Sequence, residues 1–162
     1  MRLPPVIAAA AAVPLLLTAC GDDGAGGGSG ACGPIRREAL DPSFLQHVLT
    51  DEGVVYTSDP PTSGPHQPTP PVEGVADAPL PKPVQIGVLE RGDVLLQHGP
   101  DLPARQITAL EALAGDGVVV APNPDLPEPV VATAWVYKRT CSSVEVEDLE
   151  EFIAERRDQG PE

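Results

Sequence analysis

The chain has 162 residues, enough for one domain of ordinary size and too few for two domains with separate large cores. Ten basic residues stand against 24 acidic ones, and the formal net charge of −14 argues against nucleic acid or anionic lipid as a direct partner. Aromatic residues make up only 3%, so we expect a core built mainly from valine, leucine, isoleucine and alanine.

The segment 1–19 has the pattern of an export signal, with Arg2 before an apolar run over 6–17. The sequence Leu-Thr-Ala-Cys-Gly at 17–21 resembles the bacterial lipobox, in which the cysteine is acylated and the signal is cleaved before it. We therefore predict a lipoprotein signal peptide over 1–19, acyl chains such as palmitate on Cys20, and localisation at the outer face of the cell membrane. The alternative is an ordinary secretory signal in which Cys20 is incidental.

Residues 20–34 are predicted to form a lipidated, glycine-rich flexible tether, because half of 21–34 is glycine. The extracytoplasmic globular domain then spans 35–162. Its first predicted elements are a short helix over 41–49, with Asp41 as the N-cap, and a short strand over 54–56. Nine prolines between residues 60 and 83 predict a long Pro-rich loop.

Two strands over 84–89 and 94–98 are predicted to form a hairpin, followed by a helix that Pro103 opens and Gly115 closes. The apolar runs 118–121 and 130–137 predict buried strands. A capping box at Ser142–Glu145 predicts the last helix, which Gly160-Pro161 would stop. Together these elements predict an α+β fold: one compact domain with a small mixed or antiparallel sheet of about four to five strands and about three helices.

A family resemblance emerges at the Pro-rich loop, where Tyr56 is followed by Pro-Pro-Thr-Ser-Gly-Pro-His at 60–66. This heptapeptide resembles the signature of bacterial, mainly actinobacterial, lipoproteins of domain-of-unknown-function family 3105. The resemblance covers roughly residues 45–160 and includes the segments 74–75, 79–81, 88–92, 130–135 and 152–153. It implies a single fold and a surface location, and it assigns no activity.

Members of that family typically carry a segment of the form V-H-x-L-E-H-G. Here residues 86–92 read Ile-Gly-Val-Leu-Glu-Arg-Gly, so Gly87 and Arg91 stand where the two histidines would be. If the family site is a metal cluster built from these histidines and the loop histidine, His66 is what this chain retains of it.

The candidate binding loop consists of Pro61, Thr62, Ser63, Gly64, Pro65 and His66. His66 is the candidate metal ligand or proton carrier; alternatively it is a structural histidine whose ring bonds a backbone carbonyl. The three histidines are widely spaced and form no H-x-H or H-x-x-x-H pair, which argues against a closed zinc site. His47 is expected to face solvent or to be half-buried, and His98 to lie on the face of its strand opposite Leu95 and Gln97.

No catalytic residue is predicted, because Ser63 lacks the G-x-S-x-G context and no acid in the motif orients His66. We expect Ser63 and Thr62 to bond nearby backbone as turn-forming residues. Once Cys20 is lipidated, Cys32 and Cys141 remain, which suggests a disulfide outside the cytoplasm. The alternative is a free, reactive Cys141 near a helix N-terminus.

The sequence thus predicts a non-enzymatic binding or interaction module without a cofactor, held to the membrane by lipid. Its Pro-rich loop would contact an unknown envelope protein or ligand, because a pre-ordered loop loses little entropy on binding. The alternative function is a metal-handling or redox lipoprotein whose histidine site is partly lost.

Overall fold

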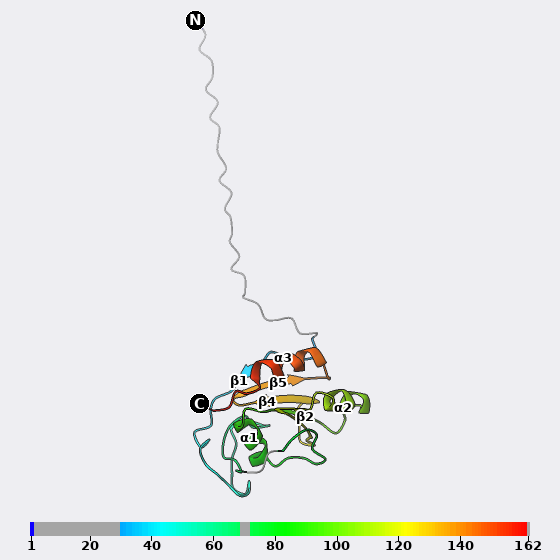
Figure 1. Cartoon of the computed structure of the whole chain (residues 1–162). Coiled ribbons are helices and arrows are strands. Elements are labelled where there is room, and N and C mark those ends of the chain that lie inside the picture. Colours follow the sequence, from blue (N-terminus) through cyan, green and yellow to red (C-terminus); the bar gives the residue numbers. More distant parts are fainter. Residues whose placement is uncertain (2–29, 69–71, 162) are drawn as a thin grey trace.

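The structure is a computed structural model that describes residues 1, 30–68 and 72–161. Within those residues the chain forms one α+β domain with a five-stranded mixed sheet and three helices (Figure 1). The elements in chain order are β1 (Arg36–Arg37), α1 (Lys82–Glu90), β2 (Val94–His98), α2 (Ala104–Glu111), β3 (Val118–Pro122), β4 (Val130–Ala134), β5 (Tyr137–Cys141) and α3 (Val146–Arg156). The predicted fold class is confirmed.

The strands lie in the order β1-β5-β4-β2-β3. Only β2 and β3 run parallel, and α2 makes the crossover between them; the other neighbouring pairs are antiparallel. A parallel pair requires such a crossover because its strands begin at the same edge of the sheet.

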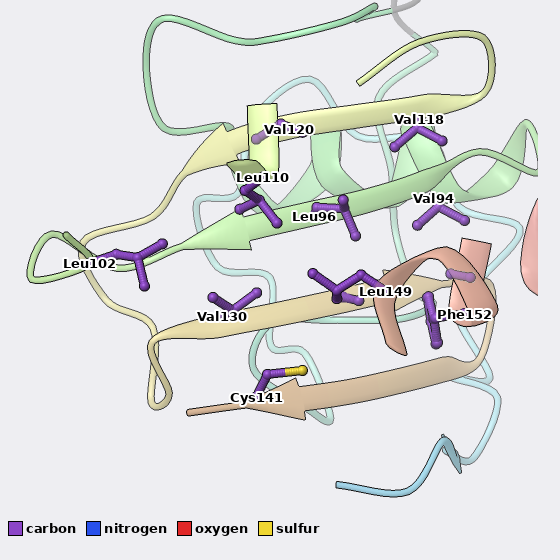
Figure 2. Close-up of a cluster of buried hydrophobic side chains, with 12 residues drawn as sticks. Val94, Leu96, Leu102, Leu110, Val118, Val120, Val130, Cys141, Leu149 and Phe152 are labelled. Carbon is purple, nitrogen blue, oxygen red and sulfur yellow. The ribbon is translucent and has the colours of Figure 1, made fainter. Parts of the chain in front are cut away.

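The sheet separates two apolar cores, because neighbouring residues of a strand point to opposite faces. On β2, Val94 and Leu96 belong to the core beneath α2 and α3, whereas Leu95 belongs to the core beneath α1. Figure 1 shows α3 and α1 on opposite sides of the sheet, and Figure 2 shows the first of the two cores. The segment 40–80, which precedes α1, packs on the second core through residues such as Phe44 and Tyr56.

The predicted strand over 84–89 is wrong, because these residues belong to α1. Six of the nine residues of α1 are buried, so the helix lacks the usual exposed polar face, and its apolar run was mistaken for a buried strand. The helix starts after Pro81, and Pro83 lies in its first turn. Amides of the first turn make no intrahelical hydrogen bond, so a proline there costs none.

The predicted helix over 41–49 and the predicted strand over 54–56 are also absent from the described residues. The carboxylate of Asp41 does accept a hydrogen bond from the amide of Ser43 at 2.8 Å, but only a turn follows. From Gln46 the backbone is extended and pairs at His47 with the distant His66. A long-range pairing has replaced a local helix.

The predicted run over 130–137 is divided by a turn at Trp135 and Val136 into the end of β4 and the start of β5. The last helix begins at Val146, with Glu145 rather than Ser142 before its first turn, and it ends at Arg156. Its acidic first turn and basic last turn are as predicted. Among the residues that the structure describes, none of the helices combines the length and apolarity needed to span a membrane.

Candidate functional site

Three potential metal ligands from distant parts of the sequence meet on the α1 side of the sheet. His66 ends the proline-rich motif, Glu90 is the last residue of α1, and His47 lies on the extended segment after the Asp41 turn. One ligand atom from each residue lies within 4.8 Å of those of the other two.

Backbone pairing brings the two histidines together. The amide of His66 donates to the carbonyl of Gln46 at 3.0 Å, and the amide of Val48 donates to the carbonyl of His66 at 2.8 Å. The ring centroids of His47 and His66 are 4.8 Å apart with an interplanar angle of 74°. This one bridge fixes the relative position of two residues that are distant in the sequence.

Burial and hydrogen bonding set the orientation of His66, which is 1% exposed. Its Nδ1 lies 3.2 Å from the carbonyl oxygen of Gly64. A carbonyl only accepts, so Nδ1 carries the hydrogen, and in the neutral ring Nε2 then presents a lone pair. Metal-binding histidines commonly donate the other ring N–H to a backbone carbonyl in this way.

The Nε2 atom of His66 faces the Oε2 atom of Glu90 at 2.9 Å. At this distance the two atoms form an ion pair if the ring of His66 is protonated. A lone pair and a carboxylate oxygen repel each other unless a cation, either a proton or a metal ion, lies between or beside them. A proton on Nε2 makes the contact a His–Glu ion pair, and a metal ion in its place would bind both atoms as ligands.

The site opens to solvent through two of its three residues. His47 is exposed and the side chain of Glu90 is 39% exposed, whereas His66 forms the buried floor. An ion could thus reach His66 from outside, with His47 and Glu90 at the rim.

The motif that carries His66 is buried: every residue from Pro60 to His66 lies in the interior. Tyr56 covers Gly64 and donates its hydroxyl to the carbonyl of Pro65 at 2.9 Å. Burial, with the charges of Asp51 and Asp41, raises the pKa of Tyr56 to about 12, so this donor keeps its proton. The predicted contact surface for a partner is therefore an internal support for His66.

The polar side chains of the motif have structural partners. Thr62 donates its hydroxyl to Glu38 at 2.7 Å, and Ser63 accepts a hydrogen bond from the amide of Asp41 at 2.9 Å. The sequence predicts bonds from these hydroxyls to nearby backbone; instead they hold a segment that lies well before the motif in the chain.

The remaining predicted site residues lie elsewhere. His98 is on the other face of β2 from Leu95, as expected, and its Nδ1 contacts the carbonyl of Gly99. Cys32 and Cys141 form a disulfide, which confirms the predicted pair and excludes the free thiol. Cys20 and the predicted signal peptide lie outside the described residues.

Two of the three cluster residues, His47 and Glu90, were not predicted as site residues from the sequence. Glu90 lies in the segment 86–92, where the family resemblance concerned two missing histidines. The carboxylate in that segment could have been considered as a metal ligand from the sequence. His47 gave no local signal, because its position depends on pairing with His66 across the fold.

The profile of a family described as "Protein of unknown function (DUF3105)" matches residues 47–162 of this sequence. The chain belongs to this family, in agreement with the resemblance found in the sequence. The comparisons gave no match among curated proteins and none among solved structures.

Proposed function

We propose that the chain is a lipid-anchored extracytoplasmic protein whose domain binds a divalent transition metal ion at His47, His66 and Glu90. The observation that carries this proposal is the convergence of three ligand atoms, from His47, His66 and Glu90, within 4.8 Å of one another, with the buried Nε2 of His66 2.9 Å from the carboxylate of Glu90. The proposal takes up the metal-handling alternative from the sequence, with a different set of ligands.

The donor set selects the class of metal. Imidazole nitrogens suit zinc, copper, iron and nickel, whereas magnesium and calcium prefer sites built from oxygen alone. Two histidines and one carboxylate leave further coordination positions for water or an added ligand, as open zinc sites do. Among divalent first-row metals the affinity of such a site rises to Cu²⁺ and is lower for Zn²⁺, and both ions suit imidazole ligands.

The structural alternative for His66 is that its ring only pins the motif through the Nδ1 contact with Gly64. That contact is compatible with both roles, since it also fixes a metal-binding tautomer. The convergence of His47 and Glu90 on the other nitrogen favours the metal, because pinning the loop does not require them.

Two observations support the extracytoplasmic part of the proposal. The segment 17–21 has the lipobox pattern, and the Cys32–Cys141 disulfide is typical of proteins in oxidising compartments. The 60–66 motif is buried, so it offers no surface for a partner. We therefore place the predicted binding role at the solvent-exposed side of the metal site, formed by His47 and Glu90. A partner would meet the bound ion at the exposed His47.

Zinc titration of the mature chain in detergent, followed by isothermal calorimetry, tests the metal site. We expect Glu90→Gln and His47→Ala each to raise the Kd for Zn²⁺ about tenfold or more, since each removes one ligand. Both residues are partly or fully exposed, so the variants should fold. Thermal unfolding gives a second readout: at 100 times the Kd, zinc should add about 2.7 kcal/mol to the stability.

The matched control is His98→Ala, which removes an imidazole from the opposite face of the sheet and should leave zinc binding unchanged. The metal site is disproved if the wild type takes up no Zn²⁺ or Cu²⁺, or if both site variants bind as the wild type does.

A further inference from the structure

A single stretch of chain, residues 30–41, joins the disulfide to the candidate metal site; we call it the N-terminal strap. At its first end Cys32 is bonded to Cys141 of β5. Beside the disulfide, the amide of Gly33 donates to the carbonyl of Thr140 at 2.9 Å, and Arg139 donates to the carbonyl of Gly33 at 3.0 Å. Strand β1 continues this pairing along the edge of the sheet.

At its other end the strap holds the motif that carries His66. One carboxylate oxygen of Glu38 accepts hydrogen bonds from both Ser58 and Thr62 at 2.7 Å. The amide of Asp41 donates to the hydroxyl of Ser63, in a contact that is also buried. Thr62 and Ser63 lie four and three residues before His66.

The strap also leads directly into the segment that carries His47. Asp41 begins the turn before that segment, and Gln46 and Val48 then pair with the backbone of His66. Both histidines of the site are thus positioned by contacts that begin at the end of the strap.

Few apolar contacts hold the strap. Strand β1 has two residues, both exposed, and Leu40 is 46% exposed. Ile35 and Cys32 are its apolar contacts with the core beneath α3, and both are only partly buried. Its other contacts are polar: the amide of Glu38 donates to the carbonyl of Val136 at 2.8 Å, and Lys138 forms an ion pair with Glu38 at 2.8 Å. Segments with few buried apolar contacts open at low free-energy cost, so loss of the covalent bond at Cys32 favours release of the strap.

We propose that the Cys32–Cys141 disulfide regulates the metal site: its reduction releases the N-terminal strap and weakens metal binding at His47, His66 and Glu90. This inference rests on the proposed function. The coupling needs no direct contact between the two sites, because the strap has a docked and a released state and metal binding favours the docked one.

The reductant is a dithiol, which supplies two electrons. One of its thiolates attacks Sγ of the half-buried Cys32, the S–S bond breaks, and Cys141 leaves as a thiolate that takes up a proton. The second thiol of the reductant then displaces Cys32 from the mixed disulfide and closes the reductant's own disulfide. The dithiol is oxidised by two electrons, and two cysteine thiols remain in the chain.

Zinc calorimetry on the mature chain in detergent compares the oxidised wild type with Cys32→Ala/Cys141→Ala. The double variant mimics the open bond without free thiols, which would bind zinc themselves. We expect its Kd for Zn²⁺ to be about tenfold higher, which is a typical allosteric coupling. Glu38→Gln, with the disulfide intact, should weaken zinc binding in the same direction, whereas Arg37→Ala, at an exposed position of the strap, should not. If the double variant does not fold, hydrogen exchange of the reduced wild type decides.

Amide hydrogen exchange tests the coupling without metal. After reduction of the wild type with dithiothreitol, we expect the amides of Val48 and His66 to exchange faster, because the strap no longer supports their pairing. Unchanged exchange together with unchanged zinc affinity would overturn the regulation and leave the metal site in place. Absence of zinc binding by the oxidised wild type would instead overturn the proposed function, and the regulatory role with it.

Discussion

Gly64 illustrates how one residue supports the site, because its backbone and its missing side chain are both used. Its carbonyl accepts the Nδ1 hydrogen of His66, and its φ of +137° is a conformation that residues with a Cβ rarely adopt. An added Cβ would lie 3.1 Å from Cδ1 of Tyr56, closer than ordinary packing allows.

We therefore expect Gly64→Ala to lower the free energy of unfolding by about 2 to 3 kcal/mol and to weaken zinc binding. Urea denaturation measures the first effect. The matched control is Gly53→Ala, which also has a positive φ of +76° but open space around the new methyl group. Backbone strain alone should make this control cost about 1 kcal/mol. Equal losses would mean that contact with Tyr56 is unimportant.

Glu38 gives the stability of the domain a specific dependence on pH. Burial alone would raise its pKa, but hydrogen bonds from Lys138, Ser58 and Thr62 and the charge of Lys138 outweigh burial and hold the pKa below 4.5. A carboxyl group whose pKa is lowered by folding stabilises the protein above its unfolded pKa and stops doing so as the pH falls through the folded value.

We expect Glu38→Gln to cost about 2 kcal/mol at about pH 7, the scale of hydrogen bonds to a charged group. The difference from the wild type should shrink as the pH falls below 4.5, because the wild-type carboxyl then becomes protonated. Urea unfolding of both proteins across this range measures it. A difference that stays constant with pH would contradict the assigned role of the Glu38 charge.

At the scale of elements, the sequence predicted the strands and helices whose signals are local. Strand β3 and helix α2 follow from a short valine run and from a proline followed by an apolar stripe. Helix α1 could not be identified in this way, since a helix buried on nearly every side has the same apolar run as a buried strand. The turn after Asp41 carried a true helix-start signal, which the pairing of His47 with His66 overrode.

The candidate site was predictable only in part. The rigid context of His66 marked it as a candidate, because prolines and a glycine surround it in the motif. Its partners His47 and Glu90 lie well before and well after it in the sequence, and neither spacing matches a helical or strand repeat that would place ligands on one face. Their convergence is a property of the folded chain.

Helix α3 is attached to β5 by an ion pair in the interior. Arg139 is 4% exposed and donates to Asp148 Oδ1 at 3.0 Å, to the Asp148 carbonyl at 2.7 Å and to Glu151 at 2.8 Å. Removing one partner leaves the other charge buried without compensation, which costs more than the pair contributes when intact.

We expect Arg139→Leu to destabilise the domain by about 3 to 5 kcal/mol in urea unfolding. Adding Asp148→Asn should recover part of this loss, because the second change removes the unpaired charge. The exposed Arg105→Ala is the control for loss of a positive charge in general. A similar loss for Arg105→Ala, or no recovery in the double variant, would show that the buried pair does not account for the effect.

In the whole molecule, the disulfide and the candidate metal ligands lie on opposite faces of the sheet. Cys32 packs with the core beneath α3, whereas the segment 40–80 and helix α1 bring the candidate ligands together on the other face. The chain thus enters the described domain beside Cys32, on the face of the sheet opposite the candidate ligands. Since the net charge of −14 repels anionic headgroups, the proposed attachment depends on acyl chains rather than on charge.

Replacement of Cys20 by alanine tests that attachment in cells. We expect the wild type to sediment with membranes and to incorporate labelled palmitate, and Cys20→Ala to do neither, because acyl chains supply about 0.8 kcal/mol per buried CH₂. The matched control is Cys32→Ala, which removes the next cysteine along the chain and should stay in the membrane fraction. Membrane retention of Cys20→Ala without label would point to an uncleaved signal, which the apparent mass would reveal. Retention with a normally cleaved mass would mean that something other than lipid holds the protein.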